Sequence, residues 1–93
     1  MSRVTVRIPT PLRGFTGGAD EVPVEGTDVR QVLLQLVSHH RGLERQLFRA
    51  DGELREFINI FLGDRNIRSL DGLDSRVESA AVVNIVPAVA GGN

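Results

Sequence analysis

The sequence contains no cysteine, no tyrosine and no lysine. Without cysteine the chain has neither a disulfide framework nor a thiol nucleophile, and without lysine no side chain can form a Schiff base. All 11 basic residues are arginine. This usage has two interpretations, a GC-rich genome or a chain without side-chain amines that could react with an activated acyl group. Composition alone leaves both interpretations open.

The chain also has little net charge and no long hydrophobic run. Its formal net charge is −1, whereas nucleic-acid binders and proteins of acidic membrane surfaces carry a basic excess. No apolar run approaches the roughly 20 residues that span a membrane, and the first residues lack the hydrophobic region of a signal peptide. We therefore expect a cytoplasmic protein with no nucleic-acid partner and no membrane partner.

The spacing of the apolar residues in the first half of the chain predicts two strands and a helix. Period-2 alternation predicts a strand over 3–8 and a second over 21–25. Pro23 suits an edge strand, because it has no N–H to give to a neighbour. Apolar residues at helical spacing then predict an amphipathic helix, which begins after Thr27 as N-cap and ends near His40.

Two further apolar segments complete the predicted fold. The stretch "FINIFL" at 57–62 and the stretch at 81–86 are predicted strands, with a short return strand near Ile67 between them. The order strand, strand, helix, strand, short strand, strand predicts an α+β protein of the β-grasp (ubiquitin-like) type. In this fold a mixed sheet packs on one main helix. We expect a β-grasp domain at 1–87 and a flexible C-terminal tail at 88–93.

No group of side chains in the sequence has the spacing of an active site. His39 and His40 are adjacent, and neighbours on a helix point about 100° apart, so they do not converge on one metal ion. Arg41, Arg45 and Arg49 have helical spacing and are expected on a solvated helix face. We therefore expect no metal site, no bound cofactor and no catalytic residue. The protein is not expected to be an enzyme.

Alternation along the two predicted central strands indicates an exposed apolar face. If Ile58, Ile60 and Leu62 face the helix, the residues between them point to the other side of the sheet. The predicted partner-binding patch consists of Phe57, Asn59, Phe61, Val82 and Val86. Exposed apolar patches mark partner sites, although a register shift of one residue would exchange the two faces and a loop could cover the patch.

The sequence ends in "IVPAVAGGN", an apolar strand that runs into two glycines. Val89, Ala90 and Gly91 lead to Gly92 with decreasing side-chain bulk. A backbone with little side-chain volume can thread a narrow channel into the active site of another protein. A carboxylate on Gly92 would then be a reacting group on a flexible rod. The alternative interpretation is an ordinary frayed terminus.

The ending "PAVAGG" at 87–92, the strand "FINIFL", the apolar helix after Thr27 and "RIPTPLR" near the start resemble the ubiquitin-like sulfur carriers. This ThiS/MoaD-like family includes the thiamin and molybdopterin carriers and, most similar, the carrier of an alternative route of cysteine biosynthesis. The resemblance spans nearly the whole chain, and its specific element is the diglycine.

The resemblance implies a role for the tail. An E1-like adenylyltransferase/sulfurtransferase would use ATP to adenylate the Gly92 carboxylate, which would then become a thiocarboxylate. Sulfide would pass to an acceptor such as a PLP-dependent cysteine synthase. Gly92 would carry the sulfur, Gly91 would give clearance, and the patch would dock the partner. The carrier itself would bind no cofactor.

The chain departs from the family pattern after Gly92, where Asn93 would block activation. Some carriers of the family end in an extra residue that a metalloprotease removes, so we expect a pro-form from which a zinc metalloprotease cuts Asn93. Three other functions stay open: the small subunit of molybdopterin synthase, a ubiquitin-like protein modifier, and an interaction domain with an inert tail.

Overall fold

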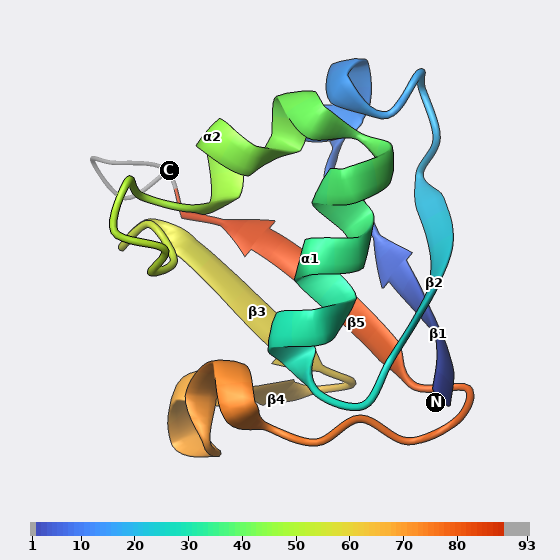
Figure 1. Ribbon diagram of the computed structural model, residues 1–93, viewed down its shortest axis with the longest axis vertical. Helices are drawn as coiled ribbons and strands as arrows, with labels where there is room; N and C mark the ends of the chain where they lie inside the picture. The colour runs from blue at the N-terminus through green and yellow to red at the C-terminus, as the bar shows by residue number, and fades with distance from the viewer. Residues whose placement is uncertain (1, 89–93) are drawn as a thin grey trace.

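The computed structural model describes residues 2–88, shown in Figure 1. The alternating N-terminal residues form β1 (Ser2–Arg7), which pairs antiparallel with β2 (Glu21–Gly26). The other regular elements are α1 (Val29–His39), β3 (Ile58–Leu62), β4 (Arg65–Asn66) and β5 (Val82–Pro87). Short helical segments lie in the connections: η1 (Thr10–Phe15), η2 (Arg41–Leu43), α2 (Glu44–Leu47), η3 (Ile67–Ser69) and η4 (Gly72–Asp74).

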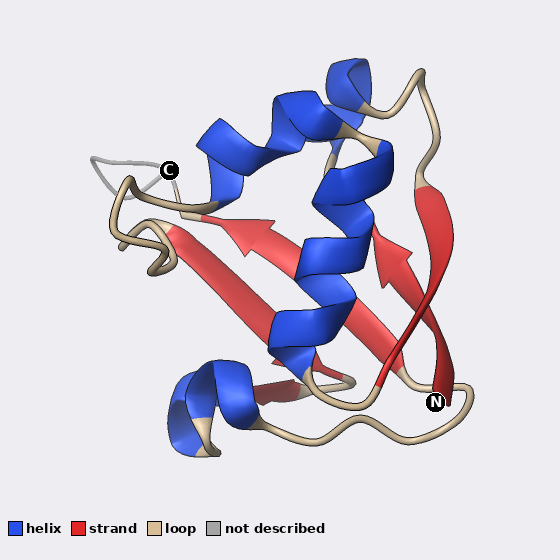
Figure 2. Cartoon of the chain, viewed as in Figure 1, coloured by secondary structure: helices blue, strands red, loops and turns tan. Residues whose placement is uncertain are grey.

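Within residues 2–88 the strands form one mixed sheet in the order β2-β1-β5-β3-β4. The β1–β5 pair is parallel, and the other pairs are antiparallel. The helix α1 crosses one face of this sheet, as Figure 2 shows. This is the predicted β-grasp, in which the C-terminal strand β5 lies in the middle of the sheet.

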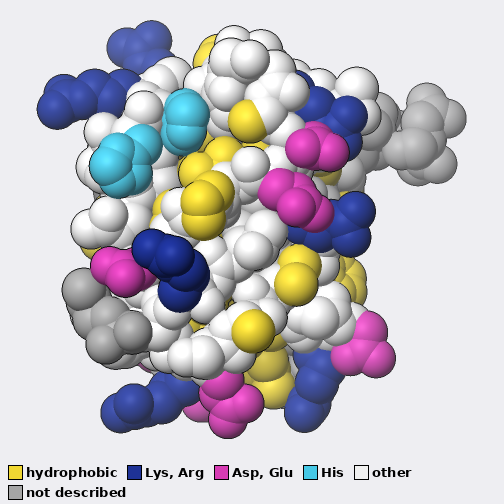
Figure 3. Space-filling model, turned by 90° about the vertical axis from the view of Figure 1, so that its right-hand side faces the viewer, with side chains coloured by type: hydrophobic (Ala, Val, Ile, Leu, Met, Phe, Trp, Pro, Cys, Tyr) yellow, Lys and Arg dark blue, Asp and Glu magenta, His cyan; other side chains and the backbone are white. Residues whose placement is uncertain are grey.

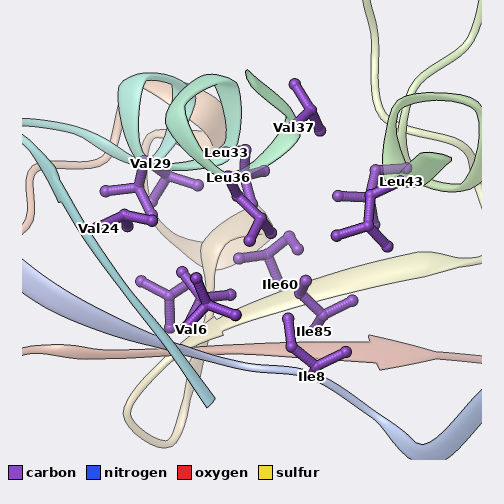
Figure 4. Packing of buried hydrophobic residues seen from close by; sticks show 14 of the residues in the cluster. Val6, Ile8, Val24, Val29, Leu33, Leu36, Val37, Leu43, Ile60 and Ile85 are labelled. Atoms are coloured by element: carbon purple, nitrogen blue, oxygen red, sulfur yellow. The ribbon is translucent and has the colours of Figure 1, made fainter. Parts of the chain in front are cut away.

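The core lies between α1 and the inner face of the sheet (Figure 4). The apolar stripe of α1 is buried, as its spacing predicted: Val29, Val32, Leu33, Leu36 and Val37. Ile60 and Ile85 approach this stripe from the two central strands, and Val6 approaches it from β1. The N-terminal half of the described chain and the last strands therefore share one core.

The helix α1 begins one residue later than predicted. Asp28, and not Thr27, is the N-cap, because the Gln31 backbone N–H donates to an Asp28 carboxylate oxygen at 2.8 Å. Thr27 instead donates from its backbone N–H and its hydroxyl to the Gln31 side-chain oxygen, at 2.9 and 2.7 Å. Both Thr27 and Asp28 are residue types that cap helices, and the sequence pattern does not show which of the two is the N-cap.

Pro23 lies on an edge strand, as predicted. It is opposite Thr5 in the β1–β2 register, and Thr5 donates its own N–H in the other direction, to the Ala81 carbonyl at 3.0 Å. In an antiparallel pair, opposite residues both turn their backbone groups toward each other or both turn them away. The missing N–H of Pro23 therefore faces the open edge of β2, where no strand needs it.

The core explains a first prediction, on stability. Leu36→Ala, at a fully buried position of α1, is expected to lower the free energy of unfolding by about 2–5 kcal/mol, because it leaves a cavity. Leu34→Ala on the same helix is the control, since Leu34 is 51% exposed, and about 0.5 kcal/mol or less is expected there. Urea unfolding followed by circular dichroism measures both. Equal losses would mean that α1 packs on the sheet through another face.

Candidate functional site

The outer face of the sheet, opposite α1, carries the predicted partner-binding patch. Ile58 and Ile60 are buried on the inner face, and Leu62 is half-buried there against the core. On the outer face Phe57 is 53% exposed and Val86 is 42% exposed. The predicted orientation of the two central strands is therefore confirmed, and so is the exposure of the two most accessible patch residues.

Pairing between β3 and β5 brings the patch residues together. Asn59 lies opposite Val86, and Phe61 lies opposite Asn84. Side chains opposite each other in an antiparallel pair are about 5 Å apart at Cβ, so these four share one continuous surface. Val82 accepts a hydrogen bond from the Gly63 N–H at 3.0 Å and lies at the far end of β5. It belongs to the same face but is half-buried.

Phe57 is in a turn before β3, and not in the strand as predicted. The Ile58 N–H donates to the Arg55 carbonyl at 3.0 Å, which closes a turn immediately before the strand begins. The Phe57 carbonyl still accepts from the Ala88 N–H at 2.7 Å. Phe57 therefore lies where the chain leaves β5, so that it borders both the patch and the start of the predicted tail.

The polar residues of this face are held by side-chain hydrogen bonds. The Asn66 amide donates to the Asn59 side-chain oxygen at 3.3 Å, and the Asn84 amide donates to the Gly63 carbonyl at 3.4 Å. The first bond links β4 to β3, and the second links β5 to the turn after β3, so they fix the amides beside the apolar side chains. The exposed apolar surface thus carries preplaced polar groups.

A hollow of about 460 Å³ lies beside Ala88. Its lining includes Phe57 and the arginines Arg49 and Arg55. Arg49 is 2.6 Å from Asp51, whose carboxyl has a lowered pKa, mainly because the backbone N–H of Glu53 donates to it and further because of Arg49. The loop that flanks the start of the tail therefore holds a positive charge paired with a negative one at neutral pH.

The sequence does not predict that Arg49 and Arg55 lie together beside this hollow. The sequence predicts Arg49 on a helix face with Arg41 and Arg45, but α2 ends at Leu47. Arg49 and Arg55 belong to the irregular segment before β3, and their backbone hydrogen bonds, to Glu53 and Leu47, close its loop. Irregular segments have no period, so no pattern in the sequence places their side chains.

The two histidines lie at the surface of the face that carries β2, coloured cyan in Figure 3. Among residues 2–88, no three or more histidine, aspartate or glutamate side chains come close enough to hold a metal ion. Arginines and acidic residues are interspersed on this face, with no field of one charge (Figure 3). In the same part of the chain, no helix is long and apolar enough to span a membrane.

The predicted tail residues Val89, Ala90, Gly91, Gly92 and Asn93 lie outside the described residues. The structure describes the chain as far as Ala88, one residue after β5 ends. The division into a domain at 1–87 and a tail at 88–93 stays a prediction. The last described residue is nonetheless placed by its hydrogen bond to Phe57, at the border of the patch.

A β-grasp whose central C-terminal strand ends beside an exposed apolar face defines a ubiquitin-like protein. More specifically, the chain belongs to the ThiS family, whose family model matches residues 6–92. It is 37% identical over 91 residues to the sulfur carrier protein CysO of Mycobacterium tuberculosis, a match that covers 96% of this chain and 98% of that protein.

Solved structures agree with this assignment. A chain in the crystal structure of the Amycolatopsis orientalis BexX/CysO complex is 38% identical, with a TM-score of 0.88 over 96% of this chain and 99% of that chain. The small archaeal modifier protein 1 of Methanosarcina acetivorans is 33% identical, with a TM-score of 0.87 over 99% of this chain and 98% of that chain. These relatives are named as carriers and as a modifier, not as catalysts.

Proposed function

We propose that this chain is a sulfur carrier that acts through a thiocarboxylate on Gly92. The observation that carries the proposal is the family match, which runs from residue 6 through Gly92 and so includes the diglycine. The outer face of the sheet supports it, because an exposed apolar surface borders the point where the tail begins. The carrier supplies the reacting carboxylate and the docking surface, and its partners supply the catalysis.

The chemistry requires activation, because a carboxylate is a poor electrophile. In the proposed reaction, an oxygen of the Gly92 carboxylate attacks the α-phosphorus of ATP in the E1-like adenylyltransferase/sulfurtransferase, and pyrophosphate leaves. A sulfide equivalent then attacks the acyl carbon, and AMP leaves with the former carboxylate oxygen. The product is a thiocarboxylate. No cysteine or lysine of this chain can intercept the acyl adenylate.

The length of the tail limits how far the docked patch can lie from the active site of the partner. An extended chain spans at most about 3.3–3.6 Å per residue, so residues 88–92 reach about 17 Å from the end of β5. A partner that binds Phe57 and Val86 therefore has its adenylation site within about 17 Å of that contact. The small side chains of the tail suit a narrow channel across this distance.

We expect the chain without Asn93 to gain the mass of one sulfur in place of one oxygen when it is incubated with the E1-like enzyme, ATP and sulfide. Intact-protein mass spectrometry measures this change. A variant that lacks both Gly92 and Asn93 is the matched control and is expected to keep its mass, because it cannot place a carboxylate at the same point. If the cognate enzyme produces no mass gain, the remaining interpretation is an interaction domain with an inert tail.

For the acceptor, we propose a PLP-dependent cysteine synthase. The support is the likeness to CysO over nearly the full length of both chains. The test is to mix the thiocarboxylated chain with the synthase and its activated serine substrate and to measure cysteine. The thiocarboxylate sulfur is expected to attack the serine-derived carbon and displace its leaving group, which gives an acyl adduct of the chain with cysteine that intact-protein mass spectrometry detects. Hydrolysis of the acyl bond by water then releases cysteine and restores the Gly92 carboxylate. Neither adduct nor cysteine would direct the search to another sulfur acceptor.

A second candidate function is protein modification, which the likeness to the small archaeal modifier protein 1 favours. There the acyl adenylate would react with a lysine amine of another protein, and an isopeptide bond would replace the bond to AMP. Since this chain has no lysine, a second carrier cannot be attached to its side chains to form a chain of carriers. Single-carrier adducts on other proteins, detected by mass spectrometry of tryptic peptides, would support modification over sulfur transfer.

A further inference from the structure

A second hollow, of about 430 Å³, lies on the outer face beside the partner-binding patch. We call it the arginine hollow. It is bounded by the end of β1, by η1 and by the two central strands. The residues that matter in its lining are apolar or basic: Phe61, Ile85, Val86, Arg7 and Arg13. Two patch residues therefore form part of its wall.

The arginine hollow is positively charged, although the chain as a whole has a net charge of −1. None of its lining residues is acidic. Arg7 is 3.7 Å from Glu21, but both side chains are more than half exposed, so this pair is weak and solvent-screened. Among the ion pairs of residues 2–88, none includes Arg13. The hollow thus has positive charge that the described part of the chain leaves largely uncompensated.

Arg13 is fixed in place. Its Nε donates to the Ile8 carbonyl at 3.0 Å in a part-buried position, and Ile8 itself is buried. A guanidinium presents donors in a rigid planar fork, so a bond at Nε leaves the terminal nitrogens oriented. An arginine held in this way loses little freedom when it binds a carboxylate.

We propose that the arginine hollow binds a carboxylate side chain of the protein partner, next to an apolar side chain that packs on Phe61 and Val86. The identity of the partner rests on the proposed function, in which the E1-like enzyme docks on this face. The apolar patch supplies contact area, and the hollow supplies orientation. A ubiquitin-like carrier needs both, because an apolar patch alone does not fix the angle at which the tail enters a channel.

A protein carboxylate fits the hollow better than a phosphate of the reacting nucleotide. Phe61 lies opposite Asn84, so the hollow is four residues back along β5 from Ala88, about 13 Å at the rise of a strand. The four residues from Ala88 to Gly92, when extended, would carry Gly92 up to about 14 Å further away. A nucleotide that reacts with Gly92 would be far from both arginines, whereas the docked surface of the partner lies directly over them.

The first test uses the chain without Asn93 and the E1-like enzyme. Arg7→Gln combined with Arg13→Gln is expected to weaken binding about fivefold to tenfold at low salt and to reduce the dependence of Kd on salt. Arg3→Gln is the matched control, since Arg3 lies on the same face of β1 and outside the hollow. Unchanged binding of the double variant, or an equal loss with Arg3→Gln, would overturn the proposal.

Arg7→Gln alone guards against a folding defect, because it keeps the hydrogen bond from Arg13 to Ile8. It is expected to weaken binding about twofold to threefold, with an unchanged circular dichroism spectrum.

The second test needs no enzyme. A negative result would therefore refute the carboxylate site but would leave the proposed sulfur-carrier function untouched. Acetyl-Leu-Asp-amide, added at millimolar concentration to the isotope-labelled chain, is expected to shift the NMR signals of Arg13 Nε and of the Phe61 and Val86 amides. The neutral probe acetyl-Leu-Asn-amide should not shift them, and Arg13→Gln should abolish the response to the acidic probe. No response to the acidic probe, or the same response to both probes, would refute a carboxylate site in the hollow.

Discussion

Removal of Asn93 is expected to turn a chain that the E1-like enzyme cannot activate into a substrate that releases pyrophosphate from ATP. In the longer chain the Gly92 carbonyl is part of an amide bond, so no carboxylate exists at that position. The Asn93 carboxylate lies one residue further along the backbone, about 3.5 Å away. A displacement of 1 Å at a reacting centre can already cost about 10²-fold in rate, so we expect at least a hundredfold difference in pyrophosphate release.

The comparison needs both chains at equal concentration with the same enzyme and ATP. Asn93→Ala is the matched control and is expected to be as inactive as the chain with Asn93, because the block comes from the extra residue and not from its side chain. Binding to the enzyme should persist in all three chains, since none of them changes the exposed patch residues Phe57 and Val86. Equal pyrophosphate release with and without Asn93 would show that Gly92 is not the reacting terminus.

The same reasoning leads to the proposal of a protease partner. A protease that cleaves the Gly92–Asn93 bond meets a sequence with almost no side chains to recognise on the amino-terminal side of that bond. A zinc-bound water attacks a peptide carbonyl without a protein nucleophile, so a zinc metalloprotease suits this substrate. The family match ends at Gly92 and leaves Asn93 outside, which supports the residue being removable. Treatment of the protease with a metal chelator is expected to leave Asn93 in place.

The regular elements could be predicted because each has a period. Leu33 and Leu36 follow the helical period and are buried, and Ile58 and Ile60 follow the strand period and face the core. Alternation also placed Val86 on the outer face, where it is exposed. The exposed face and its apolar character thus follow from local sequence, once the helix is assigned to the other side of the sheet.

The arginine hollow could not be predicted in the same way. Arg7 and Asn84 are distant in sequence, and only the parallel β1–β5 pairing sets them side by side. Arg13 reaches the hollow from η1, and its Nε donates to the Ile8 carbonyl, a contact between residues outside any regular strand. Phe57 likewise owes its place to a turn closed by the Arg55 carbonyl, which no period signals. A feature built from separate segments can be predicted only when the pairing of the strands is already known.

Phe57→Arg is expected to abolish partner binding without changing the fold. Phe57 is 53% exposed at the border of the patch and the tail, so the arginine can remain in water in the free protein. In the complex it would bring a charge into an apolar contact. Loss of an aromatic hot-spot contact typically costs 2 kcal/mol or more of binding free energy, which corresponds to about 30-fold or more in Kd.

Ile58→Arg is the matched control for folding, because Ile58 is the next residue in the chain and is buried on the opposite face. Burying an unpaired charge costs several kcal/mol, so this variant is expected to unfold or to melt at a much lower temperature. Leu34→Arg controls for exposed charge, since Leu34 is about as exposed as Phe57 but lies on α1. It should bind the partner normally.

The three variants together separate docking from stability. Circular dichroism and thermal melting report the fold, and titration calorimetry with the E1-like enzyme reports binding. The expected pattern is a folded, non-binding Phe57 variant, an unfolded Ile58 variant and a folded, binding Leu34 variant. A Phe57 variant that binds normally would place the docking surface elsewhere on the molecule. If Leu34→Arg lost binding while Phe57→Arg kept it, the helical face would be the docking surface, and the tail would then have to reach its channel around the edge of the sheet.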